Sequence, residues 1–163
     1  MILIITVNII TLGKLKENYL RDGCSEYIKR LGAFCKLNII ELAPVPLPDK
    51  PSQSAISTAL KKEAMLIEKK LTKGAYIFAL CIEGRMATSE QFSKQINDIS
   101  LSGRSTINFI IGSSYGLDPS IKCKSDMQFS MSQMTFTHQM ARMMLLEQIY
   151  RAFMIGTNGK YHK

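Results

Sequence analysis

The chain has 163 residues, the size of one domain that buries a full hydrophobic core without disulfide bonds or metals. Lysine and arginine outnumber aspartate and glutamate by 21 to 13, and the net charge of +8 favours an anionic partner such as nucleic acid. The four cysteines form no C-x-x-C pair and have no histidine at ligand spacing. This pattern argues against a zinc site and predicts buried thiols in a reducing compartment, the cytoplasm.

The chain opens with the apolar run ILIITVNII, and residues 3–12 are predicted to form a strand. This run is short, no basic residue precedes it and no small-residue cleavage site follows it, so neither a membrane span nor a signal peptide is expected. Apolar residues at helical spacing predict a helix over 14–34, and LNIIEL predicts a strand over 37–42. The segment PVPLPDKPSQS holds four of the five prolines and is predicted to be a loop, and a helix with a lysine-rich solvent face follows over 54–72.

Strands and helices continue to alternate in the second half of the chain. Strands are predicted over 75–82, 106–111 and 127–131, and helices over 88–101, 119–124 and 137–155. Thr88 and Gln91 have the spacing of a capping box, and Asp118 followed by Pro119 is typical of a helix start. The alternation predicts one α/β domain over residues 1–163, with a mostly parallel sheet flanked by helices.

The segment GSSYG, which follows the strand over 106–111, allows two interpretations. It fits G-x-S-x-G, the strand-to-helix elbow of α/β-hydrolases, and Ser114, Asp118 or Asp126, and His138 or His162 follow in the Ser, Asp, His order. However, three residues separate the motif from the next possible helix, and no oxyanion segment of the HGGG type precedes it. The alternative is a glycine-containing turn at the end of a parallel strand, where the backbone approaches a bound cofactor.

The segment FSMSQMTFTHQMARMMLLEQIYRAFMIGTNGKYHK resembles the C-terminal signature of the RlmH family. Further matches are TLGKLKENY, SEYIKRLG, LCIEG and IIGSSYGL, so the resemblance covers nearly the whole chain. Members of this family are SPOUT-class (α/β-knot) methyltransferases that use S-adenosyl-L-methionine to methylate the N3 atom of a pseudouridine in large-subunit (23S) ribosomal RNA. The resemblance therefore implies this reaction on assembled ribosomes and makes Ser114 a turn residue. A SPOUT enzyme acting on another RNA, a non-catalytic RNA-binding module and a serine hydrolase remain alternatives.

The resemblance also implies a deep trefoil knot over roughly residues 75–163 and a cofactor held at the ends of three strands. The implied cofactor-binding residues are Leu80, Gly112, Met131, Ser132, Gln133, Met134, Thr135 and Phe136. Adenine requires backbone hydrogen bonds and apolar walls, and a glycine lets the main chain come close. No metal is expected.

Two positions depart from the family pattern. Ser113 stands where the family usually has a second glycine, and a positive φ is expected there at a cost of about 1 kcal/mol. Thr137 stands where the family usually has a proline, and its side chain is expected to cap the following helix.

Candidate catalytic residues are Tyr161 and His162 in the C-terminal tail, with His162 as base or orienting group, and Arg142 as a contact for RNA phosphate or the cofactor carboxylate. His138 is expected to brace the knot. The helix over 137–155 has no continuous solvent face, because His138, Gln139 and Arg142 lie nearly opposite Glu147, Gln148 and Arg151. This pattern predicts burial on several sides, in part against a second subunit, in agreement with the homodimer that the resemblance implies.

Overall fold

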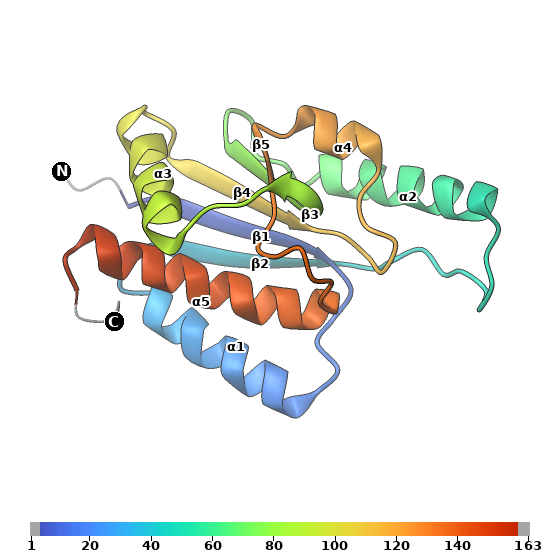
Figure 1. The fold of residues 1–163 in the computed structure, drawn as a ribbon, viewed down its shortest axis with the longest axis horizontal. Helices are drawn as coiled ribbons and strands as arrows, with labels where there is room; N and C mark the ends of the chain where they lie inside the picture. The colour runs from blue at the N-terminus through green and yellow to red at the C-terminus, as the bar shows by residue number, and fades with distance from the viewer. Residues whose placement is uncertain (1–3, 160–163) are drawn as a thin grey trace.

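The computed structural model describes residues 4–159 and contains one five-stranded sheet with helices on both faces (Figure 1). The strands are β1 (Thr6–Leu12), β2 (Lys36–Leu42), β3 (Tyr76–Arg85), β4 (Thr106–Ile111) and β5 (Met127–Phe129). The helices are α1 (Asn18–Leu31), α2 (Gln53–Glu68), α3 (Ser89–Leu101), α4 (Pro119–Lys124) and α5 (His138–Gly156). The strand order is β2-β1-β4-β3-β5 and all paired strands are parallel. The predicted α/β class with a parallel sheet is confirmed.

The sheet is buried on both faces, as its long apolar strands predict. Successive residues of β1 point to opposite sides, so Ile9 packs with α1, α3 and α5, whereas Ile10 packs with α2 and α4. On the first side the rings of Phe78 and Phe109 stack with centroids 4.7 Å apart. These two layers of side chains make the hydrophobic core and hold the carboxyl ends of the strands in place.

Helix α5 packs against the sheet and lies between α1 and α3 (Figure 1). Its residues Leu145, Leu146 and Ile149 are completely buried, and every residue from His138 to Ile155 is at least partly buried. Contacts with two helices and the sheet therefore account for much of the missing solvent face.

Several local predictions are confirmed. Thr88 and Gln91 form the capping box of α3, and the Asp118 carboxylate caps α4 with Pro119 at its first position. The Thr137 hydroxyl accepts a hydrogen bond from the Met140 N–H at 3.2 Å and caps α5.

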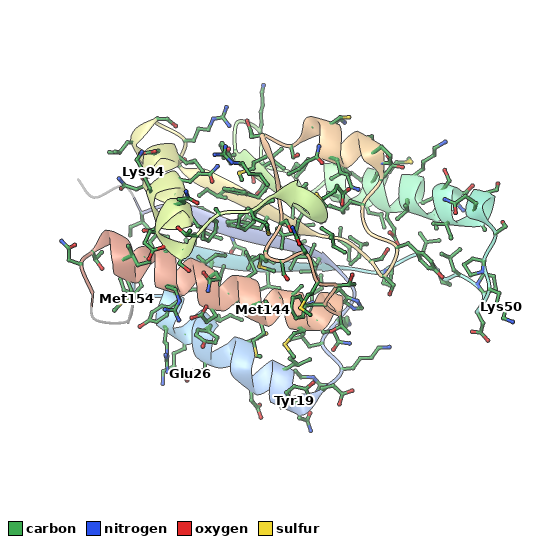
Figure 2. The ribbon with its side chains drawn as sticks, in the orientation of Figure 1. Tyr19, Glu26, Lys50, Lys94, Met144 and Met154 are labelled. Carbon is green, nitrogen blue, oxygen red and sulfur yellow. The ribbon has the colours of Figure 1, made fainter. Side chains whose placement is uncertain are left out.

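Several boundaries differ from the predictions, and two helices end early: α1 ends at Leu31 rather than at residue 34, and α2 ends at Glu68 rather than at residue 72. Helix α1 begins at Asn18 rather than Lys14, because Gly13 turns the chain with φ +106° and the Lys16 N–H donates to the Gln139 side chain at 2.7 Å. Strand β3 continues to Arg85 through an irregular register with β5, and β5 is only three residues long. The proline-rich segment is a loop as predicted, and it extends away from the sheet to Lys50 (Figure 2).

Candidate functional site

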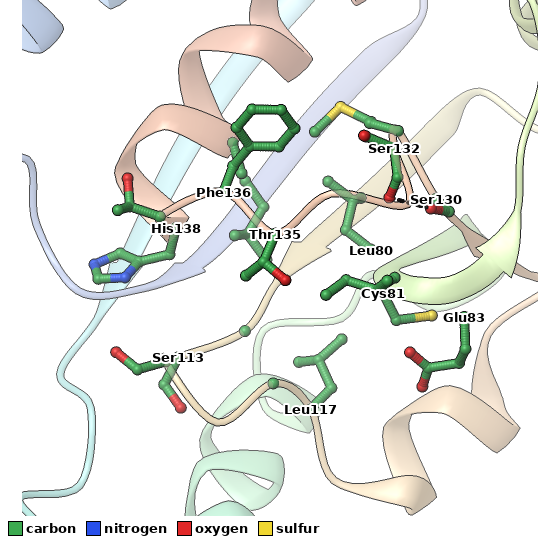
Figure 3. Close-up of a pocket in the computed structure, with 18 of the residues that line it drawn as sticks. Leu80, Cys81, Glu83, Ser113, Leu117, Ser130, Ser132, Thr135, Phe136 and His138 are labelled. Atoms are coloured by element: carbon green, nitrogen blue, oxygen red, sulfur yellow. Dashed lines mark hydrogen bonds between the residues drawn. The ribbon is translucent and has the colours of Figure 1, made fainter.

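A cavity of about 740 Å³ opens at the carboxyl ends of β3, β4 and β5 (Figure 3). Its walls come from three segments, residues 80–83, 111–117 and 129–137, and from the first turn of α5. Ligands of parallel α/β proteins bind at this end of the sheet, and the volume suits a nucleoside-sized molecule. The structure thus brings together segments that are distant in the sequence.

The residues predicted to bind the cofactor gather around this cavity. Those that line it are Leu80, Gly112, Met131, Ser132, Met134, Thr135 and Phe136. Gln133 is exposed and is not among the lining residues. The side chains of Leu80, Leu117 and Thr135 lie around the same space (Figure 3), so apolar groups and a hydroxyl line it together.

The loop after β4 is compact, and Gly112 is essential to its shape. A Cβ atom at Gly112 would lie 2.4 Å from the carbonyl oxygen of Gly116, a distance that side-chain atoms do not tolerate. The Gly116 N–H donates to the Ser113 carbonyl at 2.9 Å, and Gly116 has φ +86°. Gly112 is therefore required by the loop's own packing, in addition to any approach to a ligand.

The expected positive φ at Ser113 is wrong. Among the described residues, Asn158 is the non-glycine residue with a positive φ, and Ser113 does not share that conformation. The Ser113 hydroxyl instead donates to the Glu63 carboxylate at 2.9 Å. A serine fits here because the turn takes its left-handed residue from Gly116.

The segment after β5 is shaped by the side chain of Ser132. Its hydroxyl accepts from the Met134 N–H at 2.9 Å, and its carbonyl accepts from the Ser130 hydroxyl at 2.9 Å. Met134 is 74% exposed and Phe136 is 41% exposed. The two serines fix the backbone while apolar side chains remain open to a ligand or a partner.

Charged and titratable groups surround the cavity. The Lys122 ammonium donates to the Glu83 carboxylate, and this hydrogen bond lowers the pKa of Glu83. Burial raises the pKa of the Cys81 thiol, and Glu83 raises it further. Burial lowers the pKa of His138, with further lowering by Arg142 and Lys16. His138 is therefore neutral at pH 7 and offers one donor and one acceptor nitrogen.

The geometry disfavours the hydrolase interpretation of Ser114. The Asp118 carboxylate accepts from the Ser120 N–H, and Asp126 pairs with Arg104 at 2.9 Å. Both carboxylates thus have partners elsewhere, and among the described residues neither is bonded to the candidate His138.

Arg142 lies in the protein interior rather than among the residues that line the cavity. It is 4% exposed and donates to the Thr11 hydroxyl at 2.8 Å, to the Gly13 carbonyl at 2.9 Å and to the Glu41 carboxylate at 3.0 Å. These bonds tie α5 to the end of β1 and favour a positioning role over contact with RNA. Tyr161 and His162 lie outside the described residues.

Glu63 is a polar residue near the site that the sequence interpretation missed, as are the cavity-lining Glu83 and Lys122. It is 4% exposed and lies on the apolar face of α2, next to Ala64. A carboxylate on the buried face of an amphipathic helix is unusual. The place of Glu63 in the apolar pattern of α2 is therefore the sequence feature that could have identified it.

A family model described as "Predicted SPOUT methyltransferase" matches residues 5–162. The chain belongs to the SPOUT methyltransferase family. A "Ribosomal RNA large subunit methyltransferase H" from Streptococcus suis is 49% identical over 96% of this chain and 99% of its own length. The protein of the same name from Bifidobacterium adolescentis is 48% identical with the same coverage. The resemblance to the RlmH family is confirmed.

Solved structures agree on the fold. A methylase family protein from Haemophilus influenzae matches with a TM-score of 0.59 at 10% identity, over 99% of this chain and 72% of that chain. One from Neisseria gonorrhoeae matches with a TM-score of 0.53 at 14% identity, over 91% of this chain and 82% of that chain. At these identities the likeness concerns the fold alone.

Two further findings concern residues 4–159. No three His, Cys, Asp or Glu side chains in this range are grouped as metal ligands. None of the helices here combines the length and the apolar character needed to cross a membrane.

Proposed function

We propose that the chain is an S-adenosyl-L-methionine-dependent methyltransferase that methylates the N3 atom of a pseudouridine in large-subunit ribosomal RNA. The observation that carries the proposal is the cavity at the ends of β3, β4 and β5, which contains seven of the eight cofactor residues implied by the family pattern, Gln133 being the exception. The names of relatives that are 48–49% identical over nearly the full chain support the same reaction.

The residues around the cavity fit the cofactor chemically. Leu80 and Leu117 supply apolar walls for the adenine, and the backbone of residues 131–136 supplies hydrogen-bonding groups. Gly112 keeps the loop in the compact shape that leaves the cavity open. When bound, the cofactor supplies a methyl group activated by a sulfonium, so the protein needs to align the attacking nitrogen and exclude water.

The imide proton of the pseudouridine has to leave N3 during methylation. We assign this step to the C-terminal tail, with His162 as base or orienting group and Tyr161 as a base-stacking or hydrogen-bonding neighbour. Arg142 positions α5, and neutral His138 supplies a polar contact within the cavity. The exposed Met134 and Phe136 at the cavity support a composite site completed by a second copy in a homodimer.

The wider assignment follows from the same reaction. The substrate is ribosomal RNA in the cytoplasm, in an assembled ribosome, and the net charge of +8 favours its binding. We further propose one domain over residues 1–163, with the knot over roughly residues 75–163. A SPOUT enzyme that methylates a different RNA is the alternative.

The test has two parts. Calorimetric titration with S-adenosylmethionine and S-adenosylhomocysteine should give saturable binding near one site per subunit. Labelled methyl transfer should occur on ribosomes that carry the target pseudouridine and not on ribosomes that have uridine there. A variant with Tyr161 and His162 replaced by alanine should bind the cofactor and lose transfer.

Each outcome has a distinct meaning. A folded protein without cofactor binding refutes the methyltransferase assignment. Cofactor binding together with methylation of another RNA and none of these ribosomes identifies the alternative.

A further inference from the structure

Glu63 is a buried carboxylate whose two oxygens join two separate segments. It is 4% exposed, and burial of a carboxylate is costly unless hydrogen-bond donors surround it. One oxygen, Oε1, accepts from the Val45 N–H at 3.0 Å. The other, Oε2, accepts from the Ser113 hydroxyl at 2.9 Å. Both donors lie outside α2, so the carboxylate links the helix to two loops.

The first of these loops is the proline-rich segment after β2. Pro44 and Pro46 flank Val45 and have no N–H of their own, so this stretch has few donors with which to anchor itself. The bond to Glu63 uses the single N–H between these two prolines and holds the segment against α2.

The second loop is the wall of the cavity after β4. The Ser113 carbonyl closes the turn by accepting from Gly116, and its hydroxyl is held by Glu63. Ser113 is thus fixed by its main chain from within the loop and by its side chain from α2. A glycine at this position would keep the first bond and lose the second.

We propose that Glu63 is a positioning residue that holds the cavity-lining loop in its cofactor-binding shape through Ser113. The inference rests on the proposed function, because it takes the ligand of this cavity to be S-adenosylmethionine. A loop without this anchor samples other conformations. The apparent affinity then falls in proportion to the fraction of molecules whose loop has the binding conformation. The same carboxylate couples the loop to the proline-rich segment.

The test measures the Kd of the full chain for S-adenosylhomocysteine by calorimetry, beside circular dichroism and Tm. Ser113→Ala and Glu63→Met should each weaken binding by about fivefold to tenfold while the fold is kept. The double variant should bind no more weakly than Glu63→Met alone, because both changes remove one interaction. Glu63→Met also leaves the Val45 N–H without its acceptor, which could prevent folding. Ser113→Ala keeps that bond, so it tests the same link to the loop if Glu63→Met does not fold.

Glu63→Gln supplies the conservative rescue. Its carbonyl accepts from Val45 and its amide donates to the Ser113 oxygen, so binding should stay within about twofold of the wild type. The matched control is Glu68→Met on the same helix, where the carboxylate pairs with Lys124 at 2.6 Å and is not among the groups that line the cavity. This control should leave Kd unchanged.

The outcomes distinguish a failure of the positioning role of Glu63 from a failure of the proposed function. If Ser113→Ala and Glu63→Met lower Tm and leave Kd unchanged, the carboxylate is merely structural and the inference is overturned. Independent, additive losses in the double variant overturn the linkage through Ser113. If the wild type itself does not bind S-adenosylhomocysteine, the proposed function fails first and the inference falls with it.

Discussion

Replacing Gly112 with alanine is the sharpest probe of the loop that lines the cavity. The added Cβ would lie 2.4 Å from the Gly116 carbonyl oxygen and 2.6 Å from its carbon, where ordinary contacts begin near 3.4 Å. The backbone of the turn therefore has to retreat by about 1 Å, since neither atom belongs to a flexible side chain. Overpacking of this kind costs about 1–3 kcal/mol, and Tm falls by about 2–4 °C per kcal/mol in a chain of this size.

Because the displaced atoms form a wall of the cavity, the affinity should fall as well. We expect Gly112→Ala to weaken S-adenosylhomocysteine binding by at least about tenfold, measured by calorimetry. The control is Gly103→Ala, where the added Cβ meets no atom within 4 Å and the only strain comes from the positive φ of +85° at that residue. It should lower stability by about 1 kcal/mol and leave the affinity unchanged. Wild-type affinity in Gly112→Ala would show that ligand binding does not depend on the shape of this loop.

Three further outcomes follow from the described contacts. Arg142→Met should lower the free energy of unfolding in urea by about 2–4 kcal/mol, and unchanged stability would contradict the positioning role. Burial, Arg142 and Lys16 lower the pKa of His138 below 6.5 in the folded protein. As the pH drops through 6.5, the histidine is protonated in the unfolded chain before it is protonated in the folded chain, and the free energy of unfolding therefore falls. The wild-type Tm should fall more than that of His138→Gln between about pH 7.5 and pH 5.5, and parallel decreases would argue against the lowered pKa. Burial raises the pKa of Cys35 to about 11, whereas Cys123 is exposed. A thiol reagent should therefore label Cys123 first, as measured by mass spectrometry. Early labelling of Cys35 would contradict its burial.

Features encoded by neighbouring residues could be predicted from the sequence. The capping box of Thr88 and Gln91 and the start of α4 at Pro119 depend on residues within one turn of each other. Seven of the eight residues that the family pattern predicts to bind the cofactor line one cavity, and Gln133 is not among the lining residues.

Features that depend on distant residues could not be predicted in this way. The predicted start of α1 was wrong because the Lys16 N–H donates to the side chain of Gln139, which is 123 residues away in the sequence. The link between Glu63 and Ser113 spans 50 residues, and no local pattern encodes it. Tertiary contacts of this kind override local propensity and are invisible to periodicity.

The strand order has a consequence for the growing polypeptide. Strand β1 lies between β2 and β4, and its Asn8 side chain bonds to Asn108, which follows 100 residues later. A chain synthesised from its N-terminus can pair β1 with β2 early, but one edge of β1 stays without a neighbour until β4 has emerged. Closing so long a stretch of chain is slow, and an unpaired edge invites association with other chains. The last third of the polypeptide therefore completes the sheet as well as the cavity, and a chain truncated before β4 should be prone to aggregation.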